Sequence, residues 1–343
     1  MGHQKSKLSN EQQPIEKEFT ALTFSQIQYI CRHTNLIDNE VCRRHDQFLK
    51  ISKDGRLMKE QFTSILQEIW PTGNVHNFSN YLFNLCDKGQ KGFLEFTEFI
   101  ILNCQLNNAL SIGSGICIVK NVPIDDDNAS YLSIAKAFGG EFHRDLRMPS
   151  RAMEADSVIY RVEEDPLNTN EYAYSATNAH FPLHTDCAHF LYPAQVMMLL
   201  CCQPSINDGD GKSILTNVDD VLKMLTEQQI SDLATSQFPW WQGANQQVRA
   251  PILTKTAEGH WWIRFNQATL RREMGEDEFA KASALQSLIH VLNKIEVNPS
   301  HSISLASGDL LIVHNQRVLH GRTAFTSKSS RLLKRIRVRV PDL

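Results

Sequence analysis

A change in the spacing of apolar residues near Asn107 divides the chain into two kinds of sequence. From Phe19 up to this point, apolar residues recur every three to four positions, which is typical of amphipathic helices. From Ser114 onward, short runs rich in Val and Ile end at Gly or Pro, as strands do. A chain of 343 residues has room for two domains, since most domains contain about 100 to 200 residues. We therefore expect a flexible N-terminal segment at 1–17, an all-helical domain at 18–105 and a strand-rich domain at 106–343.

The composition argues against several classes of protein. A formal net charge of −3, with 42% hydrophobic and 21% charged residues, is typical of a soluble globular protein and gives no sign of nucleic-acid binding or disorder. We expect no membrane span and no secretory signal, because no run of about 18 apolar residues is present. The eight cysteines lack CxxC spacing and lie mostly in apolar runs. They predict reduced, buried thiols and a cytoplasmic location.

The first residues match a lipidation pattern. Gly2 and Ser6 stand at the positions that N-myristoylation requires, and a disordered polar leader is the alternative. A single myristoyl chain binds membranes only weakly and reversibly, and Lys5 and Lys7 add little charge as a second signal. We therefore expect at most weak, reversible membrane contact.

Two copies of a helix, loop and helix pattern lie within residues 18–105. Each loop is centred on a glycine and has the 12-residue length of an EF-hand calcium loop. The MGxxxSKL start, the FLK before the first loop and the WPTG linker between the copies resemble the neuronal calcium sensor family over roughly 80 residues. The resemblance implies an all-helical lobe, a myristoylated glycine, a calcium-switched apolar groove and a protein partner for the lobe.

The calcium ligands of these loops are incomplete. Calcium takes 6 to 8 oxygens, mainly from loop positions 1, 3, 5, 7, 9 and 12. Acidic side chains occupy positions 1, 9 and 12 of the second loop, namely Asp87, Glu95 and Glu98. Gly89 and Lys91 occupy positions 3 and 5, and the first loop offers only Ser52 and Asp54. The loops favour a structural or partner-binding lobe over a working calcium sensor.

The second half of the chain carries a metal-ligand pattern. His184 and Asp186 are two residues apart in NAHFPLHTDCAHF, so on a strand they point to the same face. His320 follows much later, after the strand-like run DLLIVHN. Two histidines and one carboxylate form the ligand set of the non-haem Fe(II) facial triad, which leaves metal positions open for substrates. A zinc hydrolase is an alternative use of the same ligand types.

The predicted strands surround this pattern. We expect strands within Ser114–Ile124, Ala194–Cys202, His260–Asn266, Asp309–Asn315 and Leu333–Val340. One long helix is predicted over Asp277–Ile295, with an apolar face formed by Ala280, Leu285, Leu288, Ile289 and Leu292. Many strands punctuated by Gly and Pro favour a β-sandwich or jelly roll with helical insertions. The whole chain is therefore expected to be an α+β protein of two domains.

Four motifs, in order and spacing, resemble the TauD/TfdA-like superfamily of Fe(II)/2-oxoglutarate-dependent dioxygenases. They are FPLHTDCAHF, LLCCQPSINDGDGKSIL, GDLLIVHNQRVLHGRTAF and RLLKR, and the resemblance covers residues 110–340. It implies a double-stranded β-helix in which His184, Asp186 and His320 hold Fe(II). Two metal positions then remain for 2-oxoglutarate and one for O2. The implied reaction releases succinate and CO2 while it oxidises an unactivated C–H bond, with hydroxylation, desaturation and cyclisation all open.

The resemblance also implies a site for the far carboxylate of 2-oxoglutarate. Arg331 follows His320 at the family's spacing, and Ser213 takes the place of the hydroxyl residue that assists this arginine. Arg335 matches a second family arginine, which contacts an acidic substrate in some members. Alternation places Arg331, Arg335, Arg337 and Arg339 on one strand face. A solvated face of an edge strand remains the alternative for the last two.

Residues near the triad complete the predicted site. Tyr174 and Asn178 lie in a region that contacts substrate in this superfamily, and His314 and Asn315 are expected to orient His320. Together these features predict an oxygenase that acts on a small polar metabolite, such as an amino acid or another carboxylate. The alternative is a calcium-linked regulatory or binding protein that uses an oxygenase-like scaffold.

Overall fold

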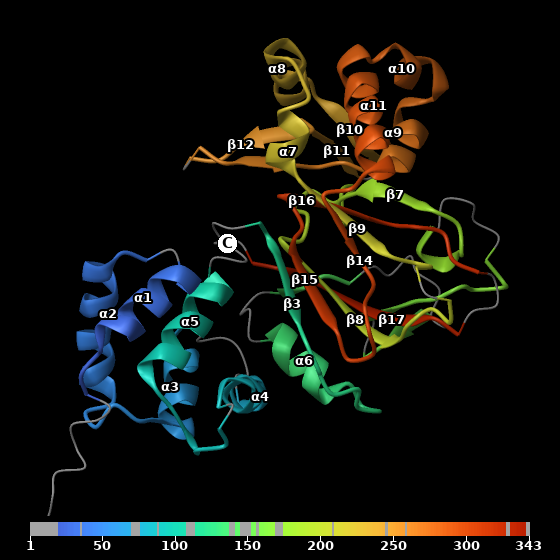
Figure 1. The fold of residues 1–343 in the computed structure, drawn as a ribbon. Coiled ribbons are helices and arrows are strands. Elements are labelled where there is room, and N and C mark those ends of the chain that lie inside the picture. The colour runs from blue at the N-terminus through green and yellow to red at the C-terminus, as the bar shows by residue number, and fades with distance from the viewer. Residues whose placement is uncertain are drawn as a thin grey trace, which may run out of the picture. The chain divides into compact units, whose positions relative to one another are not determined.

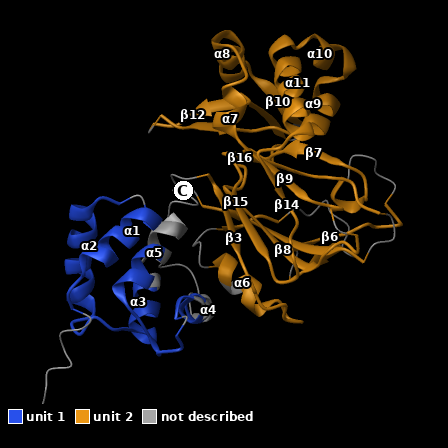
Figure 2. Ribbon diagram, in the orientation of Figure 1, with its two compact units in different colours: residues 1–69, 79–105 blue, residues 70–78, 106–343 orange. Residues whose placement is uncertain are grey.

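The computed structural model divides the chain into two compact units (Figure 2). One unit comprises residues 1–69 and 79–105, and the other comprises residues 70–78 and 106–343. The structure describes residues 20–34, 36–69, 76–87, 89–107, 114–136, 141–144, 152–155, 158–168, 174–207, 209–243, 246–257, 259–326 and 330–340. Gly2, with the rest of the predicted N-terminal segment, lies outside them.

The first unit is helical, with one short strand pairing. Its helices are α1 (Phe24–Thr34), α2 (Asp38–Ile51), α3 (Lys59–Ile69), α4 (His76–Cys86) and α5 (Phe96–Asn107). Strands β1 (Leu57–Met58) and β2 (Phe93–Leu94) pair antiparallel, with Leu57 opposite Leu94. Because each strand lies within one of the two predicted loops, the pairing joins the two helix–loop–helix copies.

Aromatic side chains fill the interior of this unit. The ring of Phe48 lies 5.4 Å from that of Phe96 and 5.5 Å from that of Phe99. Phe62 contacts Phe83 at 5.9 Å and Phe99 at 6.4 Å between ring centroids. These distances are typical of favourable aromatic pairs, so apolar contacts from both copies stabilise the helical unit.

The second unit is built on two sheets (Figure 1). The strands of the larger sheet are β3 (Ile116–Val119), β4 (Glu141–Phe142), β5 (Met153–Glu154), β6 (Ile159–Val162), β8 (Val196–Gln203), β15 (Leu310–His314) and β17 (Leu332–Arg339). The smaller sheet has the order β14-β9-β16-β7. Its members are β7 (Phe181–His184), β9 (Ser213–Asn217), β14 (His301–Ile303) and β16 (Val318–Arg322).

Two hairpins and several helices complete the second unit. The hairpins are β10 (Phe238–Gly243) with β11 (Gln246–Ala250), and β12 (Leu253–Lys255) with β13 (Trp261–Ile263). The helices are α6 (Ala129–Lys136), α7 (Val218–Leu222), α8 (Glu227–Thr235), α9 (Gln267–Met274), α10 (Glu276–Lys281) and α11 (Ser283–Val297). Helices α7 to α11 gather beside the smaller sheet (Figure 1). No helix in the described part of the chain is long and apolar enough to cross a membrane.

Strand alternation separates two cores. Leu215 and Val318 belong to a cluster that also contains Leu311 and Leu333 of the larger sheet, so this cluster lies between the sheets. Ile214 and Leu319, the chain neighbours of those residues, belong to a second cluster with the buried faces of α7, α8 and α11. Leu183 and Leu319 both belong to the second cluster. His184 and His320 are the next residues along the same strands, so their side chains point the other way, into the space between the sheets.

The predicted helix over Asp277–Ile295 is wrong in one respect, because the chain forms two helices with a break at Ala282. At Ala282 ψ is 84°, outside the helical range. Phe279 and Leu285 are both buried, whereas the predicted core residue Ala280 is exposed. Six positions along one straight helix would turn these two side chains roughly 120° apart. The break lets both reach the core.

Two further expectations need correction. Strand β17 lies inside the larger sheet, between β8 and β6, so it is not an edge strand. Of the cysteines that the structure describes, only Cys187 and Cys201 are buried, and Cys42 is exposed. The prediction of buried thiols is therefore wrong for the other described cysteines, which are partly or fully exposed although the cysteines lie mostly in apolar runs.

Candidate metal centre

Two side chains of the smaller sheet, and one from the turn that follows β7, meet between the two sheets. His184 ends β7, His320 lies in the middle of β16, and their Cα atoms are direct cross-strand partners. Asp186 follows β7 by two residues. One ligand atom from each residue lies within 4.8 Å of the others, and no other group of this kind occurs among the described His, Cys, Asp and Glu residues. The arrangement could hold one metal ion.

The ligand atoms of this group lack partners among the described residues. His184 Nε2, Asp186 Oδ2 and both ring nitrogens of His320 are buried and make no hydrogen bond. His184 Nδ1 lies 2.9 Å from the carbonyl of Pro182. Because a carbonyl only accepts, Nδ1 carries the proton and Nε2 keeps its lone pair. Buried lone pairs without partners are costly, and a divalent cation would satisfy all three residues at once.

The electrostatics keep these ligands in the state that metal binding requires. Burial, with the nearby His320, lowers the pKa of His184 to about 4. Burial tends to raise the pKa of Asp186, but the charge of Arg335, with the imidazoles of His184 and His320 at 3.6 and 3.8 Å, outweighs it and holds that pKa well below its usual value. At neutral pH the group therefore contains a neutral His184 imidazole and a carboxylate, as a metal site needs.

Asn315 holds Asp186 through the backbone. Its Oδ1 accepts a hydrogen bond from the Asp186 amide at 2.7 Å, and its Nδ2 donates to the Asp186 carbonyl at 2.9 Å. A third bond, also from Nδ2, goes to the Ala194 carbonyl at 2.7 Å. Asn315 is fully buried. The expectation that Asn315 orients His320 is therefore wrong, because its side chain positions the carboxylate ligand instead. His314 packs near Trp262, with ring centroids 6.1 Å apart.

Glu296 of α11 anchors the strand that carries His184. Its carboxylate accepts a hydrogen bond from the Leu183 amide at 2.5 Å and pairs with His180 at 2.7 Å. On the other side, the ring of Phe181 stacks on His184 at 3.9 Å and on Tyr174 at 5.2 Å. The strand that carries His184 is thus fixed by contacts on both sides, and Phe181 lies between the rings of Tyr174 and His184.

The predicted arginine ladder faces the space between the sheets. Arg331, Arg335 and Arg337 are 4 to 7% exposed. They alternate along the chain with residues of the opposite face, namely Leu332, Lys334 and Ile336. Arg335 Nη1 lies 3.2 Å from Asp186 Oδ1, and its guanidinium lies over the Tyr160 ring. The solvated-face alternative is therefore wrong for Arg337. It holds better for Arg339, which is partly exposed and lies 3.8 Å from Glu141.

Arg331 lies beside the β9 end of the smaller sheet. Its Nη2 donates to the Gly211 carbonyl at 3.2 Å. A Cβ atom on Gly211 would approach Arg331 Nε to 2.8 Å, and φ of Gly211 is +60°, so glycine makes room for this guanidinium. Ser213 is buried two residues further along the chain, at the start of β9. The structure thus brings the predicted arginine and hydroxyl residue to one region.

A cavity of about 750 Å³ opens beside His184 and Asp186. Its basic lining residues are Arg161, Arg272, Arg335 and Arg337, and its acidic lining residues besides Asp186 are Glu163, Glu164 and Asp165. Tyr174 and Trp241 also line it. Asn178 does not, because its side chain donates to the Phe325 carbonyl at 3.2 Å. The mixture of charges suits a small molecule that carries both signs.

The sequence reasoning missed Arg322. This residue is 5% exposed and is the Cα partner of Ser213 across the smaller sheet. It stands two positions after His320, so strand alternation alone would have placed it on the ligand's face.

In the second EF-hand-like loop, an ammonium group lies among the predicted calcium ligands. Lys91 Nζ is 2.8 Å from Glu95 Oε1 and 3.0 Å from Glu98 Oε2. The two oxygens of Asp87 accept from the amides of Lys91 at 2.8 Å and Gly92 at 2.7 Å. Burial lowers the pKa of Lys91, but the hydrogen bonds to both glutamates outweigh it and raise the pKa above its ordinary value. The acidic side chains are therefore neutralised from within the chain.

Comparison with known proteins gives results for both parts of the chain. The family model of taurine catabolism dioxygenases, TauD and TfdA, matches residues 105–337. Asparagine oxygenase, solved with Fe(II), (2S,3S)-3-hydroxyasparagine and succinate, is 16% identical and superposes with a TM-score of 0.51, covering 93% of this chain and 92% of that one. The oxygenase OrfP with Fe, succinate and (3S)-hydroxy-L-arginine is 13% identical, with a TM-score of 0.52 and 93% of each chain covered.

The N-terminal part has a different relative. Neuronal calcium sensor 1 of Lymnaea stagnalis is 33% identical over 84 residues, which are 24% of this chain and 44% of the relative. The chain thus spans less than half the length of this relative.

Proposed function

Because this chain belongs to the TauD/TfdA family of taurine catabolism dioxygenases, we propose that it is an Fe(II)- and 2-oxoglutarate-dependent oxygenase that hydroxylates an amino acid or a related carboxylate. One observation carries the proposal: His184 Nε2, Asp186 Oδ2 and both ring nitrogens of His320 are buried without hydrogen-bond partners among the described residues, beside a cavity of about 750 Å³. A site built only for stability would satisfy these atoms.

The donor set fits iron. His184, Asp186 and His320 would hold Fe(II) on one side, as two imidazoles and one carboxylate do in non-haem iron oxygenases. When bound, Fe(II) together with 2-oxoglutarate and O2 supplies the oxidising power that converts a C–H bond to C–OH and yields succinate and CO2. Asn315 would fix the carboxylate ligand, and the Pro182 carbonyl would fix the His184 tautomer.

The residues for 2-oxoglutarate follow from charge and shape. Its far carboxylate would bind the Arg331 guanidinium, whose planar fork suits a carboxylate, with Ser213 as a hydrogen-bond donor. Gly211 leaves the space that this guanidinium occupies. Arg335 contacts Asp186 and lines the cavity, so it would serve the metal ligand and the substrate from the same position.

The cavity supports an amino acid as substrate. An α-ammonium group fits the wall that contains Glu163, Glu164 and Asp165, while a carboxylate fits Arg335 or Arg337. The asparagine oxygenase and OrfP structures contain hydroxylated amino acids, which is consistent with this choice. Tyr174, which stacks on Phe181 near His184, would contact the bound molecule.

We extend the proposal to the whole chain. Residues 106–343 would form a double-stranded β-helix oxygenase domain in the cytoplasm, and residues 18–105 a structural or partner-binding lobe. The Lys91 ammonium among the loop carboxylates favours a lobe that works without calcium. Myristoylation of Gly2 and weak membrane contact stay predictions.

The test is a screen for succinate. The purified protein is incubated with Fe(II), 2-oxoglutarate and each proteinogenic amino acid, and succinate is measured with and without the metal. We expect at least one amino acid to raise succinate release, in step with a product that has gained one oxygen atom. Metal analysis of protein purified without oxygen should find iron. Succinate release that persists in Asp186→Ala, or stoichiometric zinc with no 2-oxoglutarate turnover, would contradict the proposal.

A further inference from the structure

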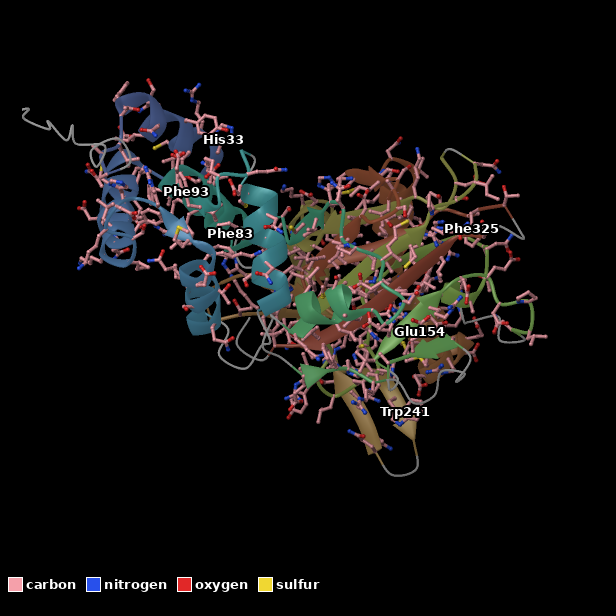
Figure 3. The ribbon with its side chains drawn as sticks, turned by 90° about the horizontal axis from the view of Figure 1, so that it is seen from below. His33, Phe83, Phe93, Glu154, Trp241 and Phe325 are labelled. Carbon is pink, nitrogen blue, oxygen red and sulfur yellow. The ribbon has the colours of Figure 1, made fainter. Side chains whose placement is uncertain are left out.

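Two buried guanidinium groups share one aromatic ring near the smaller sheet. The Cζ atom of Arg322 lies 4.8 Å from the centroid of Phe325, and the Cζ atom of Arg331 lies 5.2 Å from it. Arg322 is 5% exposed and Arg331 is 4% exposed. Figure 3 labels Phe325 within the larger unit. Placing two cations beside one ring, away from water, is unfavourable unless an anion accompanies them.

The hydrogen bonds of Arg322 use only part of its guanidinium. Its Nη2 donates to the carbonyls of Thr177 at 2.8 Å, Ala179 at 2.6 Å and Tyr174 at 3.3 Å. Its Nε and Nη1 are buried and make no hydrogen bond to the described residues, and no described carboxylate forms an ion pair with it. The three carbonyls fix the plane of the group, and the remaining donors lack an acceptor.

The strand geometry places Arg322 where an acceptor would arrive. Arg322 and His320 are two residues apart on β16, so both side chains point to the same face, roughly 6.6 Å apart along the strand. Across the sheet, Arg322 faces Ser213, and His320 faces Leu215. A five-carbon dicarboxylate with one end at the His320 position therefore reaches the Arg322 position with its other end.

We propose that Arg322 is a second arginine of the co-substrate site and binds, together with Arg331, the carboxylate of 2-oxoglutarate that lies far from the metal. This inference rests on the proposed function and extends it to a residue outside the predicted set. Two charged forks on one carboxylate select dicarboxylic 2-oxo acids over monocarboxylic ones.

The experiment measures this selection by calorimetry. Full-length protein loaded with Mn(II), which does not turn over, is titrated with 2-oxoglutarate and with 2-oxopentanoate, which lacks the far carboxylate. In the Arg322→Gln variant we expect the affinity for 2-oxoglutarate to fall about tenfold to a hundredfold, because a buried charge-assisted contact is lost. The affinity for 2-oxopentanoate should change by less than about threefold. Arg322→Lys, which keeps the charge but not the fork, should lie between.

A matched control separates binding from folding. Arg264 is partly buried and also donates to backbone carbonyls, those of Phe190 and Leu191. Arg264→Gln should leave the ratio of the two affinities unchanged. If Arg322→Gln weakens both acids equally or leaves the ratio unchanged, Arg322 is only a clamp on the 174–179 backbone and the inference is wrong. If Arg322→Gln does not fold, an unchanged ratio in Arg322→Lys has the same meaning. If the unmodified protein binds neither acid, the proposed function itself fails.

Discussion

The metal triad and the second EF-hand-like loop both gather acidic or imidazole ligands, yet they differ in what those ligands contact. In the loop, Lys91 Nζ lies 2.8 and 3.0 Å from two of the carboxylates, and backbone amides satisfy Asp87. In the triad, Asp186 Oδ2, His184 Nε2 and both ring nitrogens of His320 make no hydrogen bond to any described residue. One cluster is complete without an ion, and the other is not.

The comparison shows that the identity of ligand residues does not by itself define a metal site. The loop retains three of the acidic positions of an EF-hand, but a cation of the chain has been placed among them. The triad side chains are 5 to 10% exposed, whereas Lys91 and its partners are 24 to 31% exposed. Unpaired ligand atoms cost most where water is excluded, so the triad has the stronger need for a metal.

The largest effect should come from removing the carboxylate of the triad. Asp186→Ala leaves two imidazoles, and we expect Fe(II) affinity to fall by more than about a hundredfold, since even residues that support metal ligands contribute 10- to 100-fold. Iron content after dialysis and succinate release measure this. Asp277→Asn, an exposed acid of α10, is the control and should bind iron normally. Equal iron binding by Asp186→Ala and Asp277→Asn would show that the triad carboxylate is not needed to hold iron. The contrast between the triad and the loop would then be lost.

A smaller loss is expected when Asn315 is shortened. Asn315→Ala removes the three hydrogen bonds that fix the Asp186 backbone and the Ala194 carbonyl. Metal affinity should fall about tenfold to a hundredfold, with the ligands themselves unchanged. Mn(II) titration followed by electron paramagnetic resonance provides the measurement, and Asn293→Ala on the exposed face of α11 is the control. Unchanged Mn(II) affinity would show that the turn holds Asp186 without Asn315.

The loop should gain an ion when its own cation is removed. In the double variant Gly89→Asp and Lys91→Asn, the new Asp carboxylate supplies the ligand that is missing at loop position 3. The new Asn side-chain oxygen replaces the Lys91 ammonium at position 5. The nearest atoms to a Cβ added at Gly89 belong to the Lys91 side chain, at 3.2 Å, and the second change shortens this side chain. We expect calcium affinity to rise by at least about tenfold by calorimetry, to a micromolar site. Lys53→Asn, in the first loop, should have no effect. Micromolar calcium binding by the unmodified protein would show that Lys91 does not block the loop.

The smallest effect concerns a buried histidine that is not one of the three ligands. Burial, with the nearby Arg317, lowers the pKa of His314 to about 4. The folded state therefore binds fewer protons than the unfolded state between about pH 4 and pH 6.5. Stability from this group is complete above pH 6.5 and decreases as pH falls toward 4, by at most about 1.4 kcal/mol per pH unit.

Denaturant unfolding of the metal-free protein at several pH values measures this slope. His314→Gln should have a shallower dependence than the unmodified protein, whatever its stability at neutral pH. His290→Gln, an exposed change on α11, should keep the original slope. Identical slopes for all three proteins would contradict the shift assigned to His314.

Sequence reasoning anticipated local features best. The i and i+2 spacing of His184 and Asp186 and the alternation of Arg331, Arg335 and Arg337 each depend on residues within one strand, and the structure places those side chains on shared faces. The long helix was predicted without its break, because a ψ angle of 84° at Ala282 depends on burying Phe279 and Leu285 in the same core. Helical periodicity carries no information about that core.

By itself, the sequence determined the change from helical to strand-like spacing, the ligand types of the triad and the family to which the chain belongs. Only the tertiary structure decided that Asn315 positions Asp186 across 129 residues, and that Arg322 and Arg331 share the Phe325 ring. The reason is physical. Periodicity reports which face a side chain takes within its own element, whereas these contacts depend on how the sheets pair and pack, which no local spacing specifies.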